Sequence, residues 1–199
     1  MKLLVVVASA TGRTRRMADA LAEGARGAGA DASVVRAEDA SADDLLAADA
    51  IVLGSGVHMA GIASSMRAMF ERTAPLWLEG KLVGKVGAAF ATAGEGGRGG
   101  GELALVSLLA YLAENGLLLV PMHNRQRGFR SAGCHWGPLA RTNPRDGVAG
   151  PTDAQLAAAR AHGQHVAECT ARWLRGGAIP HDQPGDEIRT PPGGRPEHG

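Results

Sequence analysis

The chain has 199 residues, of which 45% are hydrophobic and 21% charged, a composition typical of a globular protein with a sizeable core. Its formal net charge of +1 supplies no field that would attract nucleic acid, and an aromatic content of 4% argues against a stacking surface for single strands. Cys134 and Cys169 are the only cysteines, so no disulfide framework is expected. The first apolar run is too short for a secretion signal or a membrane span, and we expect a cytoplasmic protein without a membrane span.

Strand-like and helix-like segments alternate along the chain. Apolar segments typical of parallel strands occupy residues 3–8, 33–36, 51–53, 86–92 and 117–120. Helical spacing predicts helices over residues 14–28 and 103–113, a helical stripe at 62–73, a short helix beginning at Ser41, and a last helix beginning at a capping box in 151–155. Parallel strands require crossover connections, so this order predicts an α/β fold with a doubly wound, five-stranded parallel sheet and helices on both faces.

One domain is expected over residues 1–175. From Gly176 onward, 11 of the 24 residues are Gly or Pro, which predicts a disordered C-terminal tail over residues 176–199. A segment of about thirty residues after Pro121 is rich in Gly, Arg, Asn and Pro, and we expect it to form a long loop.

Ligands of doubly wound sheets bind beyond the carboxyl ends of the strands, so the loops that follow the strands carry the functional hypotheses. Loop one is Ser9-Ala10-Thr11-Gly12-Arg13-Thr14, placed between the first strand and the first helix. Free N–H groups at the helix start, together with the hydroxyls and the arginines, suit a bound phosphate. The same residues also suit a hydroxyl-capped turn with solvated arginines.

Two nucleotide-binding alternatives fail at loop one. A P-loop requires Gly-Lys-Ser/Thr, which occurs nowhere in the chain. A receiver domain would need acidic residues at the strand ends, where Ser9 and Ser55 stand instead.

Two further glycine-rich loops follow the third and fourth strands. Loop two, residues 54–61, contains Val57-His58-Met59, which could cover one face of a flat ring, although His58 could equally face solvent. Loop three, residues 92–99, contains Thr92-Ala93-Gly94-Glu95-Gly96-Gly97, whose backbone N–H groups suit the edge of a planar heterocycle or, alternatively, form only a flexible surface loop. Its Gly-x-Gly-x-x-Gly pattern is not read as a dinucleotide fingerprint, because that motif belongs to the first βα turn.

The three loops together resemble those of the flavodoxin-like FMN proteins. "SATGRT" matches the phosphate-loop pattern Ser/Thr-x-Thr-Gly-x-Thr, and the chain is similar to the WrbA-type NAD(P)H:quinone oxidoreductases within that superfamily. The corresponding segments, collinear from Lys2 to about Leu174, are "DAIVLGSG", "SSMRAMFERTAPLWLEGKLVGKVGAAFATAG", "NGLLLVP", "CHWGP" and "PTDAQLAAARAHGQHVAE".

The resemblance implies a site and an activity. FMN would be held by its phosphate at residues 9–14, flanked by residues 57–59 and contacted at its edge by residues 92–97. NAD(P)H would reduce the flavin, and a quinone-like acceptor would reoxidise it in a two-electron ping-pong cycle, with no catalytic side chain required. The resemblance also places Trp77 near the substrate of a neighbouring subunit in a homodimer or homotetramer, whereas by itself Trp77 would equally suit a core position.

Three positions depart from the family pattern. Val57-His58-Met59 replaces Thr-Arg-Phe, Thr11 stands in place of a frequent aromatic residue, and Asn115 stands in place of a common His. In the long loop, His135 and Trp136 are expected to form part of the ring or substrate wall rather than a catalytic pair with Cys134. No metal site is expected, since His162 and His165 share a helical face without an evident third ligand.

Two competing functions remain. A non-enzymatic flavodoxin would carry single electrons between redox partners, but such carriers are usually strongly acidic, unlike this chain. A flavodoxin-like module without FMN would bind a partner, although the intact phosphate loop argues against it.

Overall fold

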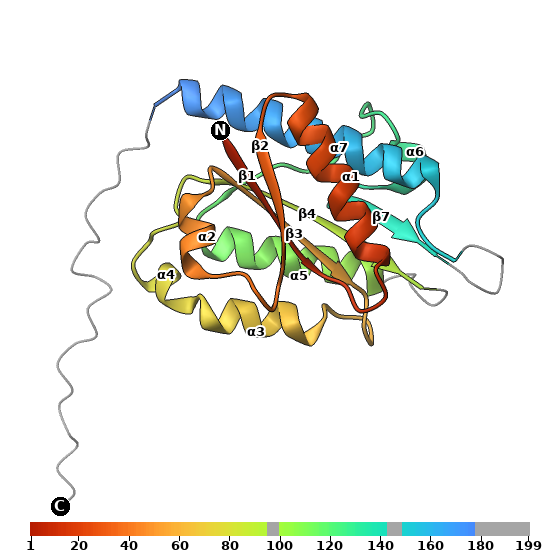
Figure 1. Ribbon diagram of the computed structural model, residues 1–199, viewed down its shortest axis with the longest axis horizontal. Coiled ribbons are helices and arrows are strands. Elements are labelled where there is room, and N and C mark those ends of the chain that lie inside the picture. The colour runs from red at the N-terminus through yellow and green to blue at the C-terminus, as the bar shows by residue number, and fades with distance from the viewer. Residues whose placement is uncertain (95–99, 143–148, 178–199) are drawn as a thin grey trace, which may run out of the picture.

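The computed structural model describes residues 1–94, 100–142 and 149–177, which form a central sheet covered by helices on both faces (Figure 1). The strands are β1 (Lys2–Ala8), β2 (Asp31–Arg36), β3 (Ala50–Gly56), β4 (Val86–Ala93), β5 (Leu118–Leu119), β6 (Gly133–Cys134) and β7 (Gly137–Arg141). The helices are α1 (Arg13–Gly27), α2 (Ala42–Ala47), α3 (Ser64–Arg72), α4 (Ala74–Leu78), α5 (Gly100–Glu114), α6 (Phe129–Ala132) and α7 (Asp153–Arg175). No described helix is long and apolar enough to cross a membrane.

The sheet has the order β2-β1-β3-β4-β7-β6, with β5 also paired to β4, and all pairs are parallel except β6 with β7. The expected doubly wound α/β fold is confirmed, but the expected number of five strands is wrong. The fifth position in the sheet, next to β4, is occupied by two strands. β5 pairs with the start of β4 at Val86 and Gly87, and β7 pairs with the end of β4 at Ala91–Ala93.

The segment after Pro121 is therefore only partly a loop. The chain leaves the sheet after β5, forms α6 and β6 in an excursion over residues 121–136, and returns to the sheet as β7. Pro121 has no N–H to continue the ladder, which explains why the strand stops there. The return was missed because β7 is short and contains Pro138, so it shows neither a long apolar run nor a clear alternation.

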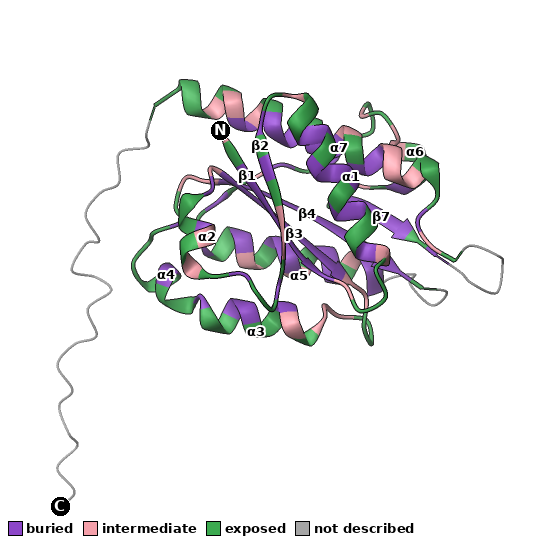
Figure 2. Ribbon diagram, in the orientation of Figure 1, coloured by how far each residue is buried: buried purple, intermediate pink, exposed green. Residues whose placement is uncertain are grey.

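Both faces of the sheet are buried, as Figure 2 shows along β1, β3 and β4. One core cluster joins the sheet to α2, α3, α4 and α5, and the other joins it to α1 and α7. Within β3, a Cβ on Gly54 would lie 1.9 Å from Phe90 Cζ, so the aromatic ring of β4 occupies the space that a side chain would need. Small residues thus allow the two central strands to pack a large ring between them.

Helices α1 and α7 pack closely through glycines. A Cβ on Gly24 would lie 1.8 Å from the Arg160 carbonyl oxygen, and one on Gly163 would lie 1.9 Å from that of Leu21. The backbones therefore approach at positions where any side chain would collide. This glycine contact fixes the distance between the two helices on that face of the sheet.

Most helix boundaries follow local signals. Ser41 forms the expected capping box with Asp44 at α2, and Thr152 forms one with Gln155 at α7. The stripe over 62–73 corresponds to α3 and the predicted helix over 103–113 to α5, which begins earlier, at Gly100. Most of the proposed tail, residues 178–199, lies outside the described residues.

Candidate functional site

The strand register brings the loops after β1, β3 and β4 to one edge of the sheet. Ala8 of β1 lies opposite Ser55 of β3, and Gly56 of β3 lies opposite Thr92 of β4. These strands are parallel, so loops one, two and three start side by side at their carboxyl ends (Figure 1). This is the edge at which doubly wound proteins bind ligands.

Loop one ends in a helix start that is open to an anion. Gly12 takes the left-handed conformation (φ 80°) directly before α1, which a side chain would disfavour. The first turn of α1 contains no acidic residue, and Ser9 Oγ accepts a hydrogen bond of 3.1 Å from the Arg15 N–H. The N–H groups of Arg13 and Thr14 have no acceptor among the described residues. Free N–H donors, a positive helix end and neighbouring arginines fit a phosphate dianion.

A buried hydroxyl pair joins loop one to β4. Thr14 Oγ1 and Thr92 Oγ1 lie 2.7 Å apart, and both residues are buried. The Thr92 carbonyl also accepts a hydrogen bond of 2.8 Å from the Val57 N–H, so Thr92 contacts all three loop regions. The sequence suggests Thr14 as a hydroxyl donor to a phosphate, and its hydroxyl can still donate to a phosphate when it accepts the hydrogen bond of Thr92.

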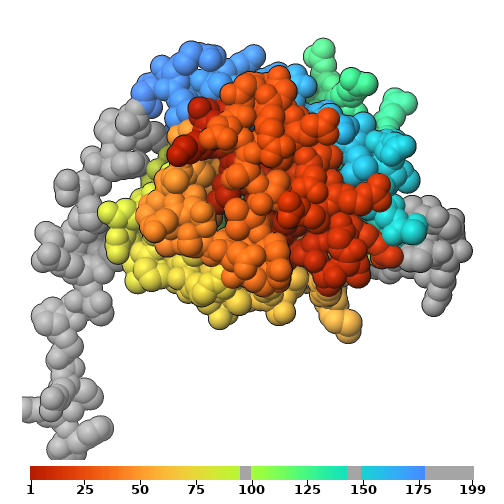
Figure 3. Space-filling model, in the orientation of Figure 1, coloured from red at the N-terminus to blue at the C-terminus, as the bar shows by residue number. Residues whose placement is uncertain are grey.

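Loop two closes on itself in a tight turn. The His58 N–H donates to the Gly61 carbonyl and the Gly61 N–H to the His58 carbonyl, both at 2.9 Å. The two residues between them, Met59 (φ 48°) and Ala60 (φ 66°), take left-handed conformations that usually favour glycine. Figure 3 shows this loop as an orange-yellow projection at the lower edge of the surface.

The triplet expected to flank a ring divides into three environments. Val57 is half-buried and packs against the core, His58 is exposed, and Met59 is fully exposed at the tip of the turn. Ser55 Oγ connects the two ends of loop two, because it donates to the Gly56 carbonyl at 2.8 Å and accepts from the Ala63 N–H at 2.9 Å. Of the triplet, only His58 lines the cavity described next.

A cavity of about 730 Å³ opens between loop one, loop two and the start of α3. Its volume lies within the range of cofactor sites. Its lining comprises Ser9, Ala10, Glu38, His58, Gly61, Ile62, Ala63, Ser64, Ser65, Arg67 and Ser107. Three of the expected residues, Ser9, Ala10 and His58, therefore meet around one cavity, which we call the edge cavity.

Several lining residues were missed by the sequence reasoning. Glu38 follows β2, whose carboxyl end lies at the same edge, so the rule that selected the other loops also applies to this one. Ser64 and Ser65 begin α3 and carry no motif of their own. Ser107 reaches the cavity from α5, and only tertiary packing could show this.

Loop three is described only in part. Ala93 is buried and its carbonyl accepts hydrogen bonds from the N–H (2.8 Å) and the hydroxyl (3.3 Å) of Thr142, while Gly94 is exposed. Glu95, Gly96 and Gly97 lie outside the described residues. Their expected contact with a ring edge stays a prediction.

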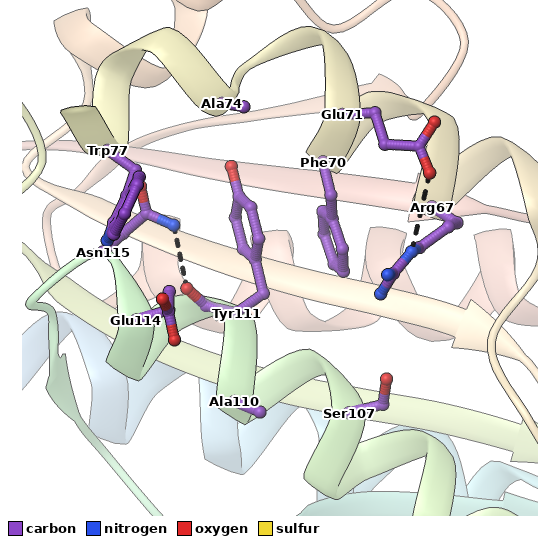
Figure 4. A pocket seen from close by; sticks show the side chains of 10 residues that line it. All are labelled: Arg67, Phe70, Glu71, Ala74, Trp77, Ser107, Ala110, Tyr111, Glu114 and Asn115. Carbon is purple, nitrogen blue, oxygen red and sulfur yellow. Dashed lines mark hydrogen bonds and ion pairs between the residues drawn. The ribbon is translucent and has the colours of Figure 1, made fainter. Parts of the chain in front are cut away.

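Trp77 lies far from the edge cavity of its own chain. It belongs to α4, next to the amino ends of the strands, and lines a groove of about 470 Å³ between α3 and α5 (Figure 4). Phe70 stacks on Tyr111 in this groove with ring centroids 3.8 Å apart, and Asn115 donates from Nδ2 to the Tyr111 carbonyl at 2.9 Å. Burial raises the pKa of Tyr111, against the smaller opposing effect of its hydrogen bond to Thr73. Trp77 is half exposed and is therefore not a core residue.

His135 and Trp136 form the turn of a β-hairpin rather than a wall of the edge cavity. They connect β6 to β7, and Trp136 is exposed beside the start of β7. Only the other end of β7, at Arg141, pairs with the end of β4. Neither residue lines the edge cavity, and their contact with a ring or a substrate stays a prediction.

Histidines approach one another elsewhere without forming a metal site. In residues 1–94, 100–142 and 149–177, no three His, Cys, Asp or Glu side chains are placed so that they could hold a metal ion.

Comparison with known proteins identifies the family. Residues 4–84 match the family model described as a flavodoxin domain. The chain is 33% identical over 198 residues to a protein of Rhizobium rhizogenes named NAD(P)H dehydrogenase (quinone), with 87% of this chain and 98% of the relative covered. A protein of the same name from Sinorhizobium fredii is 33% identical over 196 residues, with 86% and 98% covered. The chain belongs to this family.

Solved structures agree with this assignment. The WrbA-like flavodoxin of Agrobacterium tumefaciens has a TM-score of 0.68 at 26% identity, with 86% of this chain and 98% of that chain covered. A flavodoxin from the domain Archaea has a TM-score of 0.65 at 26% identity, with 86% and 99% covered. The expected WrbA-type family and flavodoxin-like fold are confirmed, and the chain is an FMN-type oxidoreductase.

Proposed function

We propose that this WrbA-type protein holds FMN in the edge cavity, takes electrons from NAD(P)H and passes them to a quinone-like acceptor. The observation that carries this proposal is the start of α1, where the N–H groups of Arg13 and Thr14 have no acceptor among the described residues, beside a cavity of about 730 Å³ at the carboxyl edge of the sheet. FMN, when bound, supplies hydride chemistry that no side chain can supply. The protein itself binds, orients and shields the reacting groups.

The phosphate would lie at loop one. The N–H groups of Arg13 and Thr14 point from the first turn of α1, and the left-handed Gly12 keeps the backbone curved around this position. Arg16 is exposed and close to the site, so it adds positive charge to that of the helix dipole. Thr11 is exposed in the loop and offers a second hydroxyl beside that of Thr14, which is hydrogen-bonded to Thr92.

The flavin ring would lie between loops two and three. His58 lines the edge cavity and is placed to contact one face of a ring, whereas Met59 points to solvent and would reach the ring only by a change in the turn. We propose the backbone of residues 92–97 as the contact for the ring edge. We propose a two-electron ping-pong cycle, in which NAD(P)H and the quinone-like acceptor use the same face of the flavin in turn.

A homodimer or homotetramer would complete the site. Trp77 lies next to the amino ends of the strands, at the edge opposite the edge cavity, so we expect its half-exposed ring to approach the cofactor of another subunit. Further apolar side chains are exposed on the helices that line its groove, Leu78 on α4 and Leu103 and Val106 on α5. Burying these side chains between subunits would stabilise an assembly.

Absorbance and rapid kinetics test this function. The purified protein should be yellow, NADPH or NADH should bleach it in stopped-flow experiments, and benzoquinone should restore the colour. A protein that stays colourless and takes up no added FMN would contradict the proposal. A yellow protein that needs a separate reductase and forms a stable semiquinone would instead be a flavodoxin-type electron carrier.

A further inference from the structure

The excursion over residues 121–136 is fastened to α7 around one buried histidine. His162 on α7 has no exposed surface, and its Nδ1 lies 3.1 Å from Gln126 Nε2 in the excursion. An amide nitrogen only donates, so Nδ1 accepts this hydrogen bond and the ring proton lies on Nε2. His162 Nε2 and Gln126 Oε1 are buried without a partner among the described residues.

The other contacts between the excursion and α7 are few and small. Met122, Ala132 and the half-buried Phe129 pack on Ala158 in a cluster separate from both large cores. Gly128 sits directly on α7, since a Cβ there would lie 2.6 Å from Ala158 Cα. A surface this small gives the excursion a lower local stability than the sheet.

The groups that face His162 disfavour a positive charge. His165 lies on the same helix with ring centroids 6.4 Å apart, and His123 of the excursion contacts the ring of His165 edge-on at 5.2 Å. Burial, together with the smaller effect of charge on His165 and His123, lowers the pKa of His162 to about 3. Glu168 and Arg172 act on His165 with opposite signs.

Among the described residues, the other elements that pack on α7 supply no counter-charge to His162. Strands β3 and β4 contain no titratable residue. On α1, Glu23 is paired with Arg160 at 2.7 Å on the surface, and on β7 Arg141 is paired with Glu102. The charged residues of the excursion itself, Arg125, Arg127 and Arg130, are exposed cations.

We propose that the excursion is an acid-sensitive latch, which opens from α7 when His162 takes up a proton. In the closed state, the neutral imidazole is favoured because it is fully buried, no carboxylate among the described residues bonds to it, and Nδ1 accepts the hydrogen bond from Gln126. In the open state, water reaches the ring and the cation is tolerated. Because the excursion leads directly into β7, which pairs with Ala91–Ala93 of β4, opening loosens the strand beside loop three.

The direction and size of the effect follow from proton linkage. The closed state is fully favoured above the ordinary histidine pKa of 6.5, and this advantage is lost as the pH falls from 6.5 towards about 3. At pH 5, the opening equilibrium should be about 30-fold larger than at pH 8, if only the open state binds the proton.

Hydrogen exchange of the full chain between pH 5 and pH 8 tests the latch. After correction for the intrinsic chemical rates, we expect peptides of residues 121–136 to open about 30-fold more at pH 5, while peptides of β1 and β3 do not change. In His162→Gln, which cannot be protonated, the pH dependence of the excursion should disappear. His165→Gln removes a half-exposed imidazole from the same helix face. This variant should keep most of the pH dependence of the excursion, and it is therefore the matched control.

A second measurement keeps the test independent of the variant's folding. NMR of the wild-type imidazoles should show His162 neutral in the closed state at pH 5 while exchange of the excursion rises. The latch is overturned by a change of less than about threefold in wild-type exchange, or by a parallel rise in β1 and β3. It is also overturned by a His162→Gln variant that folds and keeps the pH dependence.

Discussion

Thr14 and Thr92, 78 positions apart in the chain, share a buried hydrogen bond of 2.7 Å between their hydroxyls. This contact connects the first turn of α1 to the end of β4 and thereby joins the phosphate loop to the strand that leads into loop three. Together with the strand register, this pair of side chains thus fixes the relative position of two loops that are expected to hold opposite ends of one cofactor.

Thr92→Val should uncouple these loops. The variant keeps the shape of the side chain but leaves the buried Thr14 hydroxyl without its partner, at a cost of about 1–3 kcal/mol in the free energy of unfolding. Chemical denaturation measures this loss. In the double variant Thr92→Val with Thr14→Val, no unpaired hydroxyl remains. Adding Thr14→Val to Thr92→Val should therefore lower the free energy of unfolding by less than Thr14→Val does in the wild type. Additive costs would show that the pair is not coupled.

Removing the two threonine hydroxyls of loop one should weaken FMN binding. Thr11→Ala with Thr14→Ala is expected to lower the affinity at least tenfold, because hydrogen bonds to charged groups contribute about 1.5–3 kcal/mol each. Thr11→Ala alone removes only an exposed hydroxyl, whereas Thr14→Ala also removes the hydrogen bond to Thr92, so the single variants separate the two contributions. Fluorescence titration of the apoprotein with FMN gives the dissociation constant. An unchanged constant in the double variant would show that these hydroxyls do not contact the phosphate.

Gly163→Ala should destabilise the protein, whereas Gly27→Ala should not. The added Cβ at residue 163 would lie 1.9 Å from the Leu21 carbonyl oxygen, so α1 and α7 would have to separate, at a cost of about 1–3 kcal/mol. At Gly27, the last residue of α1, no atom lies within 4 Å of the added Cβ. Thermal unfolding of both variants compares the same substitution at a position packed against another helix and at a position with free space. Equal melting temperatures would contradict the close packing of α1 on α7.

Met59 should be the first internal methionine to be oxidised by peroxide. It is fully exposed at the tip of loop two, while Met17, Met66, Met69 and Met122 have no exposed surface. Peptide mass spectrometry after brief treatment of the folded protein should find the added oxygen on the peptide that contains Met59. A Met59 that stays unoxidised under these conditions would show that loop two is covered in solution.

Much of the fold could be predicted from local patterns. The apolar runs of β1, β3 and β4 are buried on both faces and admit no other structure, and the capping boxes at Ser41 and Thr152 mark helix starts through contacts three residues apart. The fifth strand position could not be predicted in this way. It is built from β5 and β7, two short strands separated by seventeen residues, which occupy one position in the sheet only because both pair with β4.

The site divides along the same line. The order of strands and loops alone placed Ser9, Ala10 and His58 at one edge of the sheet, because parallel strands bring their following loops together. Which side chains face the cavity depends on packing over long distances. Thr14 turns to Thr92, Ser107 arrives from α5, and Trp77 lies at the opposite edge. Capping contacts and apolar periodicity act within a few residues, so they can be recognised in the sequence. The positions of these three side chains are set by contacts between residues tens of positions apart, which form only when the sheet and its helices pack.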